Sequence, residues 1–139
     1  MNNDTVNMLV GRAILAREQS YCPYSGFAVG AALLCKNGRV FTGCNIENSG
    51  YSATNCAERT AIFKAVSEGE TEFLRIAVVG GNAEEKEPSD YCPPCGICRQ
   101  VMREFCENGF EIIIAKNENE YKTVTLEELL PLSFDKRDF

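Results

Sequence analysis

The 139-residue sequence contains no histidine. Without imidazole, the Ser-His and Cys-His pairs that activate many catalytic nucleophiles cannot form, and this excludes a large share of hydrolase mechanisms. A metal site in this chain must therefore use cysteine or carboxylate ligands. The sequence also has no apolar run long enough to span a membrane, and its first residues lack the basic and apolar segments of a secretory signal. We therefore expect a cytoplasmic protein with no membrane partner.

Positive charge is scarce. The chain has 14 Lys and Arg against 20 Asp and Glu, a net charge of −6, and its basic residues form no clustered stripe. Non-specific affinity for nucleic acid comes mostly from basic side chains that neutralise phosphates. The sequence therefore predicts no nucleic-acid partner, and a free small molecule is the expected substrate.

Eight cysteines are present in a chain that has no secretory signal. In a reducing compartment such residues stay as thiols and often bind metal, whereas a disulfide framework is typical of secreted chains. The cysteines are therefore expected to be reduced, and some of them to be metal ligands.

Apolar spacing and turn residues predict an α/β fold. Residues with helical periodicity alternate with short apolar runs, the pair Asn37-Gly38 is typical of a hairpin, and Gly80-Gly81 is expected to end a strand. The polar stretch Asn45–Asn55 is expected to be a functional loop. The expected helices cover residues 4–19, 56–68, 96–107 and 126–130, and the expected strands cover residues 27–35, 40–44, 74–79, 110–115 and 121–125. This order predicts a single domain over residues 1–139, a three-layer α/β/α sandwich around a mixed sheet of about five strands.

Three cysteines in two short motifs are candidate ligands of one zinc ion. Cys56 precedes Glu58 by two residues, and Cys95 and Cys98 are three positions apart. Three thiolates leave the fourth tetrahedral position of zinc open to water, as in catalytic sites, and a glutamate beside a ligand is well placed to move protons of that water. Cys92 and Cys95 form a second Cys-x-x-Cys pair, but its two intervening prolines remove backbone N–H groups that stabilise a coordinating turn. We therefore expect one Zn²⁺ per chain on Cys56, Cys95 and Cys98, with Glu58 as the catalytic residue.

The spacing of these cysteines also fits two roles without an open metal site. They could be small buried apolar residues, or they could belong to a closed structural zinc site with a fourth cysteine. Glu58 favours an open site, because it lies next to a candidate ligand in a stretch of otherwise small and apolar residues.

A site with three thiolates and one Zn²⁺ carries one net negative charge, which opposes the ionisation of a bound water. Cys56 is expected at the start of one helix and Cys98 in the first turn of another, where the helix dipole favours thiolate. Arg59 and Arg99 are close in sequence to these ligands and can compensate further charge. We expect Arg59 to donate a hydrogen bond to a ligand sulfur.

The two motifs match a known signature, in which Cys-x-Glu is followed by Pro-Cys-x-x-Cys. On these residues the sequence resembles the homotetrameric, zinc-dependent cytidine deaminases of the cytidine/deoxycytidylate deaminase family. The resemblance spans nearly the whole chain. It includes the segments Tyr21-Cys22-Pro23-Tyr24-Ser25, Phe27 to Leu33, Gly43 to Asn48, Cys56 to Ala61, Cys95 to Gln100 and Leu129 to Phe134.

The resemblance implies hydrolytic deamination of cytidine and 2′-deoxycytidine to uridine or deoxyuridine and ammonia, a reaction of pyrimidine salvage. It also implies a homotetramer with active sites at subunit interfaces. Each matched position carries an implied role. Asn45 and Glu47 would bind ribose hydroxyls, chiefly the 3′-OH; Phe27 would line the base; the backbone of Ala57 would hold the pyrimidine carbonyl; Tyr51 would lie near a neighbouring subunit's site; Phe134 would reach across to the base; Arg59 and Gln100 would tune the zinc thiolates.

Three other functions are compatible with the zinc motifs. A deaminase of the blasticidin type shares them, although the loop Asn45-Ile46-Glu47-Asn48 favours cytidine. An enzyme that edits RNA or DNA is disfavoured by the acidic charge and the short chain. A non-catalytic zinc-binding module is the alternative from another class of protein.

Overall fold

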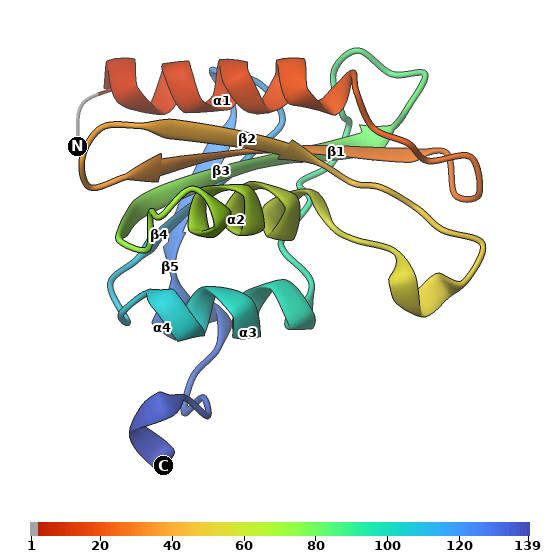
Figure 1. The fold of residues 1–139 in the computed structure, drawn as a ribbon. Helices are drawn as coiled ribbons and strands as arrows, with labels where there is room; N and C mark the ends of the chain where they lie inside the picture. Colours follow the sequence, from red (N-terminus) through yellow and green to blue (C-terminus); the bar gives the residue numbers. More distant parts are fainter. Residues whose placement is uncertain (1–2) are drawn as a thin grey trace.

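The computed structural model describes residues 3–139 as a mixed sheet with helices on both faces (Figure 1). The strands are β1 (Phe27–Cys35), β2 (Val40–Cys44), β3 (Phe73–Asn82), β4 (Glu111–Ala115) and β5 (Tyr121–Thr125), and the helices are α1 (Asn3–Arg17), α2 (Ala57–Ser67), α3 (Gly96–Phe105) and α4 (Leu126–Leu129), with 3-10 turns η1 (Tyr51–Ala53) and η2 (Lys136–Asp138). The strand order is β2-β1-β3-β4-β5, in which β3 and β4 are parallel and the other neighbours are antiparallel. No helix within residues 3–139 is long and apolar enough to cross a membrane.

Each face of the sheet has its own apolar core. Successive residues of a strand point to opposite faces, so Leu33 packs in the core under α2 and α3 while Leu34 packs in the core under α1. The same alternation continues through Ile112 and Ile113 of β4. Figure 1 shows α1 alone on one face and α2, α3 and α4 on the other. The predicted three-layer α/β/α sandwich with a five-stranded mixed sheet is confirmed.

The predicted helices and strands are all present, but β3 is longer than expected. The prediction that Gly80-Gly81 ends this strand is wrong, because both glycines pair with β1 and the strand continues to Asn82. A Cβ atom at Gly80 would lie 2.8 Å from the Cys92 sulfur, and one at Gly81 would lie 2.8 Å from the Cβ of Pro88. These glycines are therefore required by close packing inside a strand rather than by a turn.

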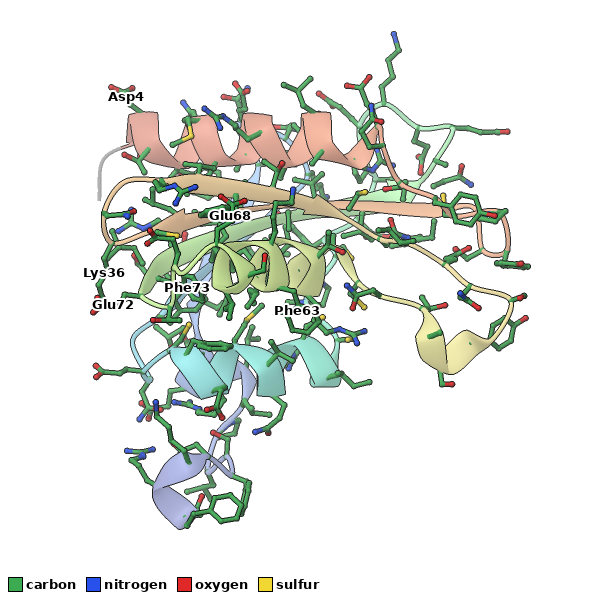
Figure 2. The ribbon with its side chains drawn as sticks, in the orientation of Figure 1. Asp4, Lys36, Phe63, Glu68, Glu72 and Phe73 are labelled. Carbon is green, nitrogen blue, oxygen red and sulfur yellow. The ribbon has the colours of Figure 1, made fainter. Side chains whose placement is uncertain are left out.

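The position of α3, which carries Cys98, is fixed on the sheet by packing near its far end. Phe73 at the start of β3, labelled in Figure 2, meets Phe105 edge-on with ring centroids 5.8 Å apart. Met102 is fully buried in the same core. Nearby, Lys36 and Glu72 form an exposed ion pair at 3.9 Å (Figure 2), which contributes little to stability.

The contact between β2 and α2 depends on a glycine. A Cβ atom at Gly43 would lie 2.4 Å from the carbonyl oxygen of Ala57 and 2.5 Å from the amide nitrogen of Ala61. Both are backbone atoms of α2 and cannot move without displacing the helix. Since Cys56 and Glu58 lie at the start of α2, this close approach sets their distance from the sheet.

We predict that Gly43→Ala destabilises the fold and weakens metal binding. The added methyl group should force α2 away from the sheet and lower the free energy of unfolding by about 3 kcal/mol. Denaturant unfolding and metal content measure the two effects. Gly109→Ala is the matched control, since a Cβ atom there meets nothing within 4 Å. Equal stability of the two variants would contradict the proposed close packing.

Candidate active site

The sulfur atoms of Cys56, Cys95 and Cys98 lie together at the starts of α2 and α3. The Sγ–Sγ distance is 3.6 Å from Cys56 to Cys95 and 3.5 Å from Cys95 to Cys98, and all three sulfurs lie within 4.8 Å of one another. Tetrahedral zinc with Zn–S bonds of about 2.3 Å requires sulfurs about 3.8 Å apart. The donor type, number and spacing of these side chains therefore fit one zinc ion. Cys92, in the competing Cys-x-x-Cys pair, is not part of this group.

The local helix geometry leaves these sulfurs available to a metal. Cys56 and Cys95 are the N-cap residues of α2 and α3, and neither sulfur accepts a capping hydrogen bond from a backbone amide of its helix. Their backbone carbonyls instead accept the first helical bonds, from Thr60 N and Arg99 N. The partial positive charge of both helix starts faces the cluster and stabilises thiolate.

Arg59 contacts the cluster as the sequence predicted. Its Nη2 donates a hydrogen bond of 3.2 Å to the Cys56 sulfur. A hydrogen bond from the Cys98 thiol and the one from Arg59 lower the pKa of Cys56 to about 5. Without metal, Cys56 therefore carries the thiolate. The hydrogen bond between Cys98 and Cys56, together with burial, raises the pKa of Cys98, which keeps its proton.

Arg99 makes hydrogen bonds to the backbone near the cluster. Its guanidinium donates 2.8 Å hydrogen bonds to the carbonyl oxygens of Pro94 and Leu129, which join the Cys95 loop to the end of α4. These contacts give Arg99 a structural role, and the arginine that donates a hydrogen bond to a sulfur is Arg59.

Glu58 lies in the first turn of α2 and is only 3% exposed. Burial raises its pKa to about 7, and the nearby Cys56 thiolate adds to this effect, while Arg59 opposes it. A carboxyl group with a pKa near 7 can both accept and release a proton at neutral pH. Glu58 therefore has the properties of a general acid and base beside the sulfur cluster.

A second polar cluster forms where β1 begins and β2 ends. The carboxylate of Glu47 accepts hydrogen bonds from the amides of Tyr24 (2.9 Å) and Ser25 (3.1 Å) and from the Ser25 hydroxyl. The Ser25 hydroxyl hydrogen bond is the main cause that lowers the pKa of Glu47. Asn45 is buried, and its side-chain amide bonds the backbone of β1 at Phe27 O (2.8 Å) and Val29 N (2.9 Å).

Backbone bonds join the two clusters. Ile46 and Asn55 exchange both of their backbone hydrogen bonds, each 2.9 Å, so the segment with Asn45 and Glu47 lies beside the residue that precedes Cys56. The Thr60 hydroxyl of α2 also donates to the carbonyl of Cys44, at 3.0 Å. The sulfur cluster and the Glu47 cluster are thus parts of one region.

Tyr51 and Phe134 lie at the surface of the single chain. Tyr51 is 78% exposed and lines, together with Glu47 and Tyr24, a cavity of about 340 Å³. Phe134 is 58% exposed and meets Phe139 edge-on in the C-terminal tail. Among the contacts described for residues 3–139, no hydrogen bond or ring contact joins either side chain to the cysteines.

Ala57 and Gln100, two further predicted residues, lie on helices at the cysteines. Ala57 is fully buried at the start of α2, and Gln100 follows Arg99 in α3. The Gln100 amide nitrogen donates a 2.9 Å hydrogen bond to the Phe134 carbonyl and so holds the tail. The sequence assigns no role to Tyr24 and Ser25, whose only local signal is a turn-rich composition, because their partner Glu47 is more than twenty residues away.

Comparison with known proteins agrees with this geometry. The family model described as the cytidine and deoxycytidylate deaminase zinc-binding region matches residues 4–114, which include the three cysteines and Glu58. The chain belongs to this deaminase family. The cytidine deaminase of Halalkalibacterium halodurans is 50% identical over 131 residues, which cover 94% of this chain and 95% of the relative. A crystal structure of cytidine deaminase from Burkholderia pseudomallei matches with a TM-score of 0.83 and 42% identity, over 96% of this chain and 100% of that chain.

Membership of the deaminase family identifies the cofactor as zinc, and the Cys56, Cys95 and Cys98 cluster is compatible with one ion. The family motifs are shared with other deaminases. A blasticidin-S deaminase of Bacillus cereus is 36% identical over 110 residues, which cover 78% of this chain and 77% of that protein.

We predict that Glu58→Gln stabilises the metal-free protein at neutral and alkaline pH. The pKa of Glu58 is about 7 in the folded chain against an ordinary 4.5, so the folded state binds the proton more tightly than the unfolded state. Stability from this group is present below pH 4.5 and is lost as the pH rises to about 7. The free energy of unfolding of Glu58→Gln should therefore exceed that of the native protein by an amount that grows to about 3 kcal/mol as the pH rises to about 7.

Denaturant unfolding with a chelator at pH 5 and pH 8 measures this difference. Glu84→Gln, at an exposed glutamate in the loop after β3, is the control. If the difference in the free energy of unfolding between Glu58→Gln and the native protein is the same at both pH values, burial does not bias Glu58 toward its protonated form.

Proposed function

We propose that this chain is a zinc-dependent cytidine deaminase. It hydrolyses cytidine and 2′-deoxycytidine at C4 of the base, and the products are uridine or deoxyuridine and ammonia. The observation that carries the proposal is the placement of Glu58: a buried carboxyl group with a pKa of about 7, two residues from Cys56, beside three sulfurs spaced for zinc. The family match and the high identity to curated cytidine deaminases support it.

Cys56, Cys95 and Cys98 would hold the zinc ion. Zinc, when bound, supplies a Lewis acid that makes water acidic enough to act as a nucleophile near neutral pH. Glu58 accepts a proton from the attacking water and delivers it to N3 of the pyrimidine. Glu58 then takes the second proton from the hydroxyl now on C4 and passes it to the amino group, which leaves as ammonia as the C4 carbonyl forms. One water is consumed, and Glu58 ends in the state in which it began.

The nucleoside would be held by the second cluster. Phe27, at the start of β1, is 44% exposed and offers a ring face to the base. The backbone of Ala57 would hold the pyrimidine carbonyl, beside the catalytic Glu58. Asn45 retains one amide N–H after its bonds to β1, and Glu47 retains acceptor capacity, so both can still bind a ribose hydroxyl.

The turnover prediction is tested by metal analysis together with the ultraviolet change during incubation with cytidine. We expect one zinc per chain and deamination of cytidine and 2′-deoxycytidine. Glu58→Gln should keep the zinc and lose turnover by about a hundredfold to ten-thousandfold, since proton transfer then has no carboxyl group. One zinc per chain with no turnover by the native protein would instead support a non-catalytic zinc module.

Blasticidin S is the comparison substrate in the same assay. Faster turnover of blasticidin S than of cytidine would assign the chain to the antibiotic-deaminating branch. Single-stranded RNA or DNA is not expected to react, because the acidic chain has no basic stripe to bind phosphates.

The active unit is proposed to be a homotetramer with the sites at subunit interfaces. Several large apolar side chains are exposed in the single chain, among them Phe63 on α2 at 48% (Figure 2), Ile97 beside the sulfur cluster, and Phe134. Tyr51 and Phe134 would complete the pockets of neighbouring subunits. The cytoplasm is the proposed location, because three reduced thiols are needed at the site and all eight cysteines are free thiols.

Light scattering tests the assembly and should give a mass about four times the 15.4 kDa of the chain. If Phe134 reaches a neighbouring site, Phe134→Ala should raise KM for cytidine about tenfold through the lost ring contact. Leu132→Ala, at another exposed apolar residue of the same tail, is the control. A monomer with full activity would contradict the shared site.

A further inference from the structure

The backbone of Phe27 is held on both sides by residues of the nucleoside pocket. Its amide N–H donates a 3.0 Å hydrogen bond to the Ser25 hydroxyl oxygen, and its carbonyl oxygen accepts a 2.8 Å bond from the Asn45 side chain. The proposed base contact is therefore bonded directly to one proposed ribose contact, Asn45. It is linked to the other, Glu47, through Ser25.

The Ser25 hydroxyl has a defined direction. A hydroxyl group has one proton, and here the oxygen accepts from Phe27 N–H, so the proton is free to go to Glu47 Oε2. The chain of donors runs from Phe27 N–H to Ser25 O–H to the Glu47 carboxylate. Bonds to an ionised acceptor are stronger than bonds between neutral groups, so Ser25 is held firmly by Glu47.

The acceptor capacity of Glu47 is nearly used up. A carboxylate offers about four acceptor positions. Oε1 accepts the amides of Tyr24 and Ser25, and Oε2 accepts the Ser25 hydroxyl. One position on Oε2 remains, enough for a single substrate hydroxyl, and its direction is set by the bond that Ser25 already makes to the same oxygen.

We infer that Ser25 is a positioning residue that aims Glu47 at one ribose hydroxyl and couples this contact to Phe27 at the base. The inference rests on the proposed deaminase function and adds a residue to its pocket. Ser25 touches no substrate atom in this role; it acts through Glu47 and Phe27.

The hydroxyl is not needed to form the turn itself. The backbone amides of Tyr24 and Ser25 hold Glu47 Oε1, and Gly26, with a φ of 67°, closes the turn through a 3.0 Å bond from its amide to the Cys22 carbonyl. These backbone bonds remain when the side chain is shortened. Ser25→Ala therefore removes the link between Glu47 and Phe27 and leaves the turn in place.

Steady-state kinetics of Ser25→Ala tests the inference. KM for cytidine should rise about tenfold, as expected for a lost hydrogen bond to a charged group, while kcat changes by less than about threefold. Ser25→Thr keeps the hydroxyl and should restore the native KM. Ser67→Ala is the matched control, since Ser67 is an exposed serine whose hydroxyl bonds a backbone carbonyl at the end of α2.

A double-mutant cycle with Glu47→Gln, and a second substrate, test whether Ser25 acts through Glu47. If Ser25 acts through Glu47, the effects of Ser25→Ala and Glu47→Gln on kcat/KM should be clearly less than additive. 3′-Deoxycytidine lacks the hydroxyl that Glu47 is expected to bind. With this substrate, Ser25→Ala should lower kcat/KM by less than about twofold. The affinity for uridine, measured by calorimetry, does not depend on turnover. It should fall in Ser25→Ala and in Glu47→Gln, again with effects that are clearly less than additive.

The outcomes separate the two proposals. A native protein that neither turns over cytidine nor binds uridine overturns the deaminase function and this inference with it. A native protein that is active, with an unchanged KM in Ser25→Ala, overturns the inference alone. An equal loss of kcat/KM for cytidine and 3′-deoxycytidine in Ser25→Ala also overturns the inference, because Ser25 would then act on the fold rather than on the hydroxyl contact.

Discussion

Clustered sulfur atoms that become negatively charged repel one another, and much of the structure near them offsets this repulsion. Cys56 and Cys95 are the N-cap residues of two helices, so both helix dipoles face the cluster. Arg59 adds a full positive charge within hydrogen-bond distance of one sulfur. The same negative charge acts on Glu58, which is buried beside it. Burial is the main cause that raises the pKa of Glu58 to about 7, and the negative charge of Cys56 adds to it.

The sheet brings the metal half and the nucleoside half of the site together. Gly43 lets α2 rest on β2, and the residues that follow β2 then pair back with Asn55, directly before the first cysteine. Short-range backbone contacts thus connect Asn45 and Glu47 to Cys56. In this arrangement the distance between the two halves is set by main-chain packing, which is far stiffer than contacts between long side chains.

Sequence reasoning found the features that depend on local pattern. Short apolar runs predicted β1 and β4, the Asn37-Gly38 pair predicted the hairpin, and the Cys-x-Glu and Cys-x-x-Cys spacings predicted the sulfur cluster. It failed where contacts between residues far apart in the sequence determine the local structure. Gly80-Gly81 has the composition of a turn but is strand, because Cys92 and Pro88 leave no room for side chains there. The bond from Ser25 to Glu47 crosses more than twenty residues, and no periodicity indicates it.

The two separate cores on the faces of β1 restrict how the chain can change in length. Leu33 and Leu34 pack in different cores, so the insertion or deletion of a single residue within β1 would move the side chains on one side of the change to the opposite face. It would also carry Phe27 out of register with Asn45, which its carbonyl binds. Natural variation in length is therefore expected in exposed loops such as residues 84–87, while β1 keeps its residue count even where its composition drifts.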